Sequence, residues 1–122
     1  MDFDFSKQKE KKLPIKEKTQ TSLLRYDEIL FLECTGNLVF VFHTKNETPY
    51  AYTNSLGSIE AELAQFGFLR ISHNRLVNMY HAQNLNSKKH QINIGGDHIL
   101  TVSRRKWHII KELLLIRKCT TK

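Results

Sequence analysis

Short apolar runs alternate with turn-forming residues through the first half of the chain, a pattern typical of β-strands joined by hairpins. Residues 30–34 and 38–43 are rich in leucine, phenylalanine and valine. The intervening residues 35–37 favour a tight turn, so we expect a hairpin with Asn37 at its tip. A third strand is expected at about residues 49–53.

Residues 55–66 change this period to that of a helix. Apolar side chains recur at the i, i+3, i+7 and i+10 positions, while Ser55 can cap the first turn and Gly67 can end the last. An apolar stripe of this kind is far more often core packing than a binding motif, so we assign it to the core. The stripe consists of Leu56, Ile59, Leu63 and Phe66.

The stretch at residues 68–78 has two short apolar pieces with a polar tetrad between them. The tetrad is Ser72, His73, Asn74 and Arg75. Because the apolar residues face the interior at period two, the tetrad is left at a strand end or loop. These side chains can bind phosphates or base edges, with asparagine suited to adenine and arginine to guanine. Taken alone, however, such a stretch is more often only a loop.

Three further strands are expected at residues 82–86, 91–94 and 98–102. The glycines at 95 and 96 favour a hairpin between the last two strands. Beyond them, apolar residues recur at helical spacing and predict a terminal helix. These residues are Trp107, Ile110 and Leu114.

The link into the terminal helix contains an electrostatic conflict. Ser103 is a suitable N-cap, yet Arg104, Arg105 and Lys106 place three cations at the helix end whose dipole favours anions. Each mismatch costs about 0.3–1 kcal/mol. A bound phosphate would relieve this cost, because free backbone N–H groups and arginine side chains together form an anion site. A solvated basic turn is the alternative interpretation.

The formal net charge of +7 and the pI near 9.5 indicate a polyanionic partner. Positive charge is concentrated at the C-terminal end, where residues 104–122 contain seven Lys or Arg against one acid, Glu112. Residues 1–20 contain six Lys against four acids. Their polar composition predicts an N-terminal arm or linker, in which residues 13–15 can touch the core as an edge strand. The domain proper is expected at residues 21–118, followed by a tail at 119–122.

Several classes of protein are disfavoured. The 122 residues suit one domain, and neither a signal peptide nor a run of about 18 apolar residues is present, so we expect a cytoplasmic protein without a membrane segment. Cys34 and Cys119 are interpreted as ordinary thiols. The six histidines lack metal-ligand spacing, and no phosphate-binding glycine loop or nucleophile motif occurs. We therefore predict no enzymatic activity and no cofactor.

Taken together, the order of these motifs over about residues 22–115 resembles the LytTR-type DNA-binding domain of bacterial transcription regulators. The most specific parts are Leu-Phe-Leu-Glu at 30–33 followed by Gly36-Asn37, the block at 68–78, and the turn at 100–105. The resemblance implies a mainly β fold with one or two short helices, arranged as an elongated stack of small antiparallel sheets. It also implies that loops, rather than a recognition helix, enter successive major grooves of double-stranded DNA.

By position, the family's DNA-binding residues fall on three segments of this sequence: Asn37 in the first hairpin, the central loop, and the turn before the last helix. The family's domains typically bind paired direct repeats as two copies, which implies a homodimer on DNA. They commonly follow a receiver domain, which the residues before Ser22 are too few to form, so the usual input is either missing or lies on another chain, such as a separate sensor or receiver protein. The complete set of DNA-binding residues that the resemblance implies is Asn37, His73, Asn74, Arg75, Arg104, Arg105 and Lys106.

The sequence thus predicts a sequence-specific DNA-binding transcription regulator. One alternative is a protein-interaction module that docks an acidic signalling partner through the same basic face. RNA binding is a second alternative, but the sequence lacks the interleaved aromatic residues that stack unpaired bases. Whether the chain is complete or an excised domain is left open.

Overall fold

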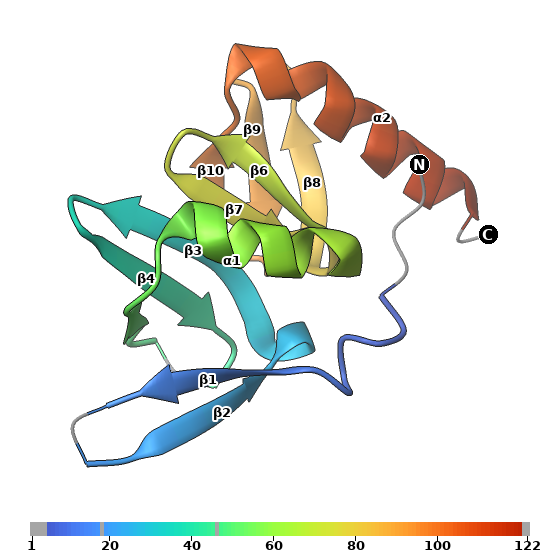
Figure 1. Ribbon diagram of the computed structural model, residues 1–122. Helices are drawn as coiled ribbons and strands as arrows, with labels where there is room; N and C mark the ends of the chain where they lie inside the picture. Colours follow the sequence, from blue (N-terminus) through green and yellow to red (C-terminus); the bar gives the residue numbers. More distant parts are fainter. Residues whose placement is uncertain (1–4, 18, 46, 121–122) are drawn as a thin grey trace.

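The computed structural model describes residues 5–17, 19–45 and 47–120, with side chains described as far as residue 114. Ten strands and two α-helices lie within these residues (Figure 1). The elements are β1 Lys12–Lys16, β2 Thr21–Arg25, β3 Ile29–Thr35, β4 Leu38–His43, β5 Tyr50–Tyr52, α1 Leu56–Leu63, β6 Phe68–Ser72, β7 Arg75–Asn78, β8 Ala82–Asn86, β9 Gln91–Ile94, β10 His98–Thr101 and α2 Arg104–Thr120. Short 3-10 turns occupy Tyr26–Glu28, Ala64–Phe66 and Met79–His81.

The central layer is a five-stranded antiparallel sheet in the order β5-β4-β3-β7-β6. Its middle strand, β3, begins with four successive apolar residues that are all buried. A strand covered on both faces needs such a continuous apolar run, whereas a half-exposed strand alternates. The expected hairpin after β3 is present, since Thr35 pairs with Leu38 and Gly36 adopts a φ of +62°.

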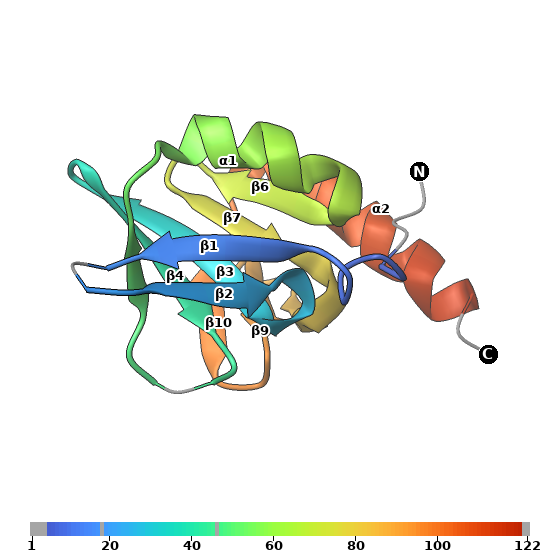
Figure 2. The same ribbon diagram turned by 60° about the horizontal axis from the view of Figure 1, so that its bottom comes forward.

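One face of the central sheet is covered by α1 and the two-stranded β1–β2 sheet (Figure 2). The predicted stripe of α1 packs here, with Leu63 fully buried. The Ser55 side chain accepts a hydrogen bond from the Ser58 backbone N–H and caps the helix. Gly67, with a φ of +95°, ends the following 3-10 turn. Local sequence therefore set both ends of this helical segment.

The opposite face is covered by the three-stranded sheet β10-β9-β8 and by α2 (Figure 1). Ile92 and Ile94 from the small sheet and Ile110 from α2 are fully buried against the central strands. The mainly β stack of small antiparallel sheets is confirmed, with the difference that α2 is not short, since it spans 17 residues. In the part of the chain that the structure describes, no helix is both long and apolar enough to cross a membrane.

The N-terminal segment is more firmly packed than its composition suggested. The expected edge strand is present as β1, in which Leu13 and Ile15 are buried. Before it, the Gln8 side chain is fully buried and exchanges two hydrogen bonds of 3.0 Å with the side chain of Asn78. Gln8 and β1, both within the predicted arm or linker of residues 1–20, are thus packed against the fold, and local composition does not reveal a partner seventy positions away.

Candidate nucleic-acid interface

Two of the predicted segments lie side by side at one end of the central sheet (Figure 1). β3 and β7 are antiparallel, and Glu33 pairs in register with Arg75. This register brings the turn before β7 next to the end of β3, where the Cys34 backbone N–H donates to the Asn74 carbonyl at 2.8 Å. The β3–β4 turn with Asn37 and the β6–β7 turn with His73 and Asn74 thus share one edge.

The third predicted segment is joined to the same edge through the neighbouring strand. The Ser103 backbone N–H donates to the Ile71 carbonyl at 2.8 Å, one residue before the end of β6. α2 begins at the next residue, so Arg104 and Arg105 follow directly on this contact. Segments that are far apart in the sequence are therefore brought together in one row of turns (Figure 1).

The central turn is held by its own hydrogen bonds. The Arg70 guanidinium donates to the His73 carbonyl at 2.8 Å, and the Ser72 hydroxyl donates to the Asn74 side-chain oxygen at 3.1 Å. The His73 imidazole is exposed. The Asn74 Nδ2 group has no partner among the described residues, so it remains a free donor in a fixed position.

Arg75 is not a free cation, contrary to what a polar loop suggests. Its Nε atom donates to the Glu33 carboxylate at 2.6 Å, and both side chains are about three-quarters buried, with 29% and 24% exposed. Arg70 forms a similar ion pair with Glu60 at 2.6 Å. One of the five N–H donors of Arg75 is therefore occupied, and the carboxylate fixes the direction of the two NH2 groups that carry the other four.

The start of α2 carries unpaired positive charge. Arg104 and Arg105 are exposed, Lys106 is half-buried, and the first turn contains no acidic residue. Among the described side chains, no carboxylate lies within ion-pair distance of these three cations. The electrostatic conflict that the sequence indicated is thus present in the fold, and no carboxylate among the described side chains relieves it. The charges of Arg117, Lys118 and Lys122 lie outside the described side chains.

Asn37 is exposed at the tip of the first hairpin. Sequence reasoning did not identify Glu33 and Arg70, which orient the central turn without belonging to it. For Glu33 a signal existed, because an acid interrupts the apolar run of a buried strand. For Arg70 no local signal existed, since an arginine in an edge strand is commonplace.

The described residues contain no group of three or more His, Cys, Asp or Glu side chains that could hold a metal ion. Cys34 is a free thiol, whereas Cys119 lies outside the described side chains. The groups with perturbed titration lie away from the row of turns. Burial raises the pKa of Tyr26, with a hydrogen bond to Glu62 adding to this effect, and burial lowers the pKa of His43.

A family model described as LytTr DNA-binding domain matches residues 19–115. Among solved structures, the fold is similar to the LytTr DNA-binding domain of a Bacillus cereus protein described as a methyl-accepting/DNA response regulator. The two chains are 17% identical, with a TM-score of 0.73, and the match covers 84% of this chain and 95% of the other. The comparison with curated proteins found no match.

Proposed function

We propose a function from one premise, which is that this chain belongs to the LytTR family of DNA-binding domains. In our proposal it is a transcription regulator that binds double-stranded DNA sequence-specifically, with its turns in successive major grooves. The observation that carries this proposal is the single row formed by the β3–β4 turn, the β6–β7 turn and the start of α2. Side-chain donors along this row can bind phosphates, which set the register, and base edges, which specify the sequence.

The proposed division of roles follows from the donors at each position. Asn74, with its free Nδ2 group, and Arg75 or Arg105 read base edges in the major groove. Arg104, Lys106 and His73 bind phosphates and set the register, with Asn37 contributing from the first hairpin. The Glu33 carboxylate supports this division, because it binds only Nε and leaves the two oriented NH2 groups of Arg75, which suit one guanine.

The wider setting of the proposal rests on the family. Two copies bind paired direct repeats, and a separate sensor or receiver protein supplies the signal. The protein acts in the cytoplasm and has no enzymatic activity of its own.

Selection from random duplex DNA followed by sequencing tests this function. We expect an enriched motif that occurs as two half-sites in the same orientation, separated by about one or more helical turns of 10–10.5 bp. The competing function, docking of an acidic protein partner, predicts no enriched motif. Competition between duplex DNA and single-stranded RNA distinguishes the proposed function from RNA binding, since an RNA-binding protein would prefer the RNA. Failure to enrich any duplex would refute sequence-specific recognition.

A pair of variants at the start of α2 tests the assigned roles. Arg105→Ala is expected to cost about 1–3 kcal/mol on the selected duplex and to blur one position of the motif. Lys106→Ala is expected to weaken binding to all duplexes by the same factor. It should also make the negative slope of log K against log salt shallower by about 0.9. If Arg105→Ala and Asn74→Ala both leave binding unaltered, the proposed face is wrong.

A further inference from the structure

The β8–β9 turn, Ser87–His90, carries two adjacent lysines that none of the assignments above uses. Lys88 and Lys89 are both exposed. Among the described side chains, neither is within ion-pair distance of a carboxylate. These two exposed charges are therefore available to an external anion.

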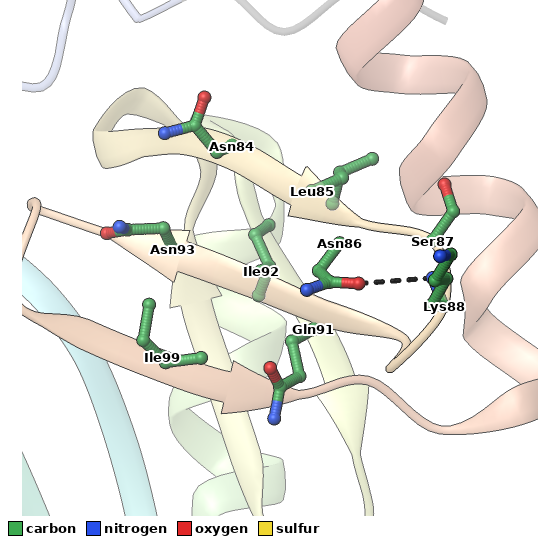
Figure 3. A pocket seen from close by; sticks show the side chains of 9 residues that line it. All are labelled: Asn84, Leu85, Asn86, Ser87, Lys88, Gln91, Ile92, Asn93 and Ile99. Atoms are coloured by element: carbon green, nitrogen blue, oxygen red, sulfur yellow. Dashed lines mark hydrogen bonds between the residues drawn. The ribbon is translucent and has the colours of Figure 1, made fainter.

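The backbone of this turn is fixed rather than loose (Figure 3). The Asn86 side-chain oxygen accepts hydrogen bonds from the backbone N–H groups of Lys88 and Lys89, both at 3.1 Å. His90 then adopts a φ of +51°, a left-handed conformation that side chains other than glycine rarely take. A strained residue of this kind persists only where its surroundings hold it. The lysine side chains therefore project from a defined position.

Two contacts tie this turn to the start of α2. The Val102 backbone N–H donates to the His90 carbonyl at 2.8 Å, next to the Ser103 contact with β6. The His90 ring also stacks on the Trp107 ring, with centroids 4.6 Å apart and planes 13° apart. Trp107 lies in the first turns of α2, so the lysine turn and Arg104 are attached to one rigid unit (Figure 1).

The surface next to the turn, as far as the structure describes it, has no negative charge that would repel a polyanion. A groove of about 520 Å³ follows the outer face of β8, β9 and β10, and its lining contains amides and apolar side chains but no acid (Figure 3). The side-chain amides of Asn84 and Gln91 in this groove have no hydrogen-bond partner among the described residues. Their amides can donate to phosphate oxygens without adding charge.

We propose that the β8–β9 turn is a fourth DNA contact, in which Lys88 and Lys89 bind backbone phosphates of the same duplex beside the start of α2. This inference rests on the proposed function and extends its footprint. Lysine is a flexible point charge without base preference at such a site, so the turn contributes affinity and register rather than sequence reading. His90 and Trp107 act as positioning residues that couple the turn to α2.

The test is a salt titration of binding to the selected duplex, comparing the wild-type chain with a Lys88→Ala/Lys89→Ala variant. The slope of log K against log salt is negative, and each lost phosphate contact makes it shallower by about 0.9. We therefore expect the slope of the variant to be shallower by about 1–2. Affinity for unrelated duplexes should fall by the same factor, and the enriched motif should stay unchanged. A Lys88→Arg/Lys89→Arg variant should keep the wild-type slope.

A Lys12→Ala/Lys16→Ala variant is the matched control. It removes the same charge from exposed positions on β1, on the other side of the central sheet (Figures 1 and 2). We expect its slope to remain at the wild-type value. If the control lowers the slope as much as the Lys88 and Lys89 variant, net charge explains the effect and the inference is overturned.

The remaining outcomes separate the inference from its premise. A wild-type chain that binds an enriched duplex, with an unchanged slope in the Lys88 and Lys89 variant, refutes the fourth contact and leaves the proposed function intact. A wild-type chain that binds no duplex refutes both.

Discussion

The two ends of β7 carry the same residue type in opposite circumstances. Asn74 precedes the strand and keeps a free Nδ2 donor at the row of turns, whereas Asn78 ends the strand and is fully buried. The Asn78 Nδ2 group donates to Gln8 Oε1 and to the carbonyls of Tyr26 and Ile29, at 2.9–3.1 Å. Its Oδ1 atom accepts from Gln8 Nε2 and the Tyr80 backbone N–H.

The difference shows how one strand can serve stability at one end and recognition at the other. A buried amide with all its partners holds the N-terminal segment, the 3-10 turn after β2 and the end of β7 in one arrangement. An amide with an unused donor at the other end is available to a ligand. The three residues between them, 75–77, pair in register with the central strand β3 and hold the two amides at a fixed separation.

The largest effect is expected from Asn78→Ala. This change removes the Asn78 donor from Gln8 Oε1 and from the Ile29 carbonyl, at about 1–3 kcal/mol for each buried group. Gln8 Nε2 keeps its bond to the Phe66 carbonyl, and the Tyr26 carbonyl keeps the Ile29 N–H. We expect a loss of more than ~3 kcal/mol in the free energy of unfolding, measured by chemical denaturation. Gln8→Ala is the matched variant and should cost less, because Asn78 keeps its contacts with Tyr26, Ile29 and Tyr80. Equal stability of Asn78→Ala and the wild-type chain would remove the basis of the comparison.

Asn74→Ala should show the reverse profile. It removes one partly exposed contact with Ser72, so the free energy of unfolding should change by less than ~1 kcal/mol, while binding to the selected duplex weakens by about 1–3 kcal/mol. Asn74→Asp is a sharper variant, because it keeps an acceptor for Ser72 but replaces the free donor by a negative charge. It should bind more weakly than Asn74→Ala. Tighter binding by Asn74→Asp would contradict the assigned donor.

Glu33→Gln tests whether the carboxylate orients Arg75. A partly exposed ion pair contributes little to stability, so unfolding should change by less than ~1 kcal/mol. Removal of a negative charge from the interface should raise affinity for unrelated duplexes, and a freer Arg75 should reduce the preference for the selected duplex. The ratio of the two affinities, measured at one salt concentration, is the readout. An unchanged ratio would show that Arg75 needs no orientation by Glu33.

The smallest effect is expected from His43, which is buried at the end of β4 with 5% exposed. Its Nε2 atom bonds the Thr48 carbonyl at 3.0 Å, and its Nδ1 atom accepts from the Lys45 backbone N–H at 3.2 Å. Burial lowers the pKa of His43 below its usual 6.5, so the unfolded chain binds the proton first as pH falls. Stability should therefore decline as pH drops through about 6.5 and level off below the folded pKa.

Denaturation of the wild-type chain and of a His43→Gln variant at several pH values measures this contribution. The variant should lose the part of the pH dependence that begins near 6.5. DNA binding by the variant at neutral pH should match the wild type, because His43 is buried at the end of β4 and does not belong to the row of turns. Weaker DNA binding by a variant of unchanged stability would contradict this prediction, because it would couple His43 to the row of turns.

Patterns over neighbouring residues were sufficient for most elements of this protein. The Gly36 turn, the capped stripe of α1 and the cations at the start of α2 all follow from positions a few residues apart, where propensity and periodicity act. The apolar runs at residues 30–34 and 38–43 likewise predicted the strands β3 and β4. The family resemblance added the expectation that three distant segments share one face.

Only the tertiary structure decided which side chains within those segments are available. Arg75 and its partner Glu33 are 42 positions apart, and Gln8 and Asn78 are 70 apart. Such pairs depend on strand register and on the path of the chain, which no local pattern encodes. For the same reason Asn74 and Asn78, four residues apart and alike in sequence, could be told apart only once the fold had buried one of them and left the other with a free donor.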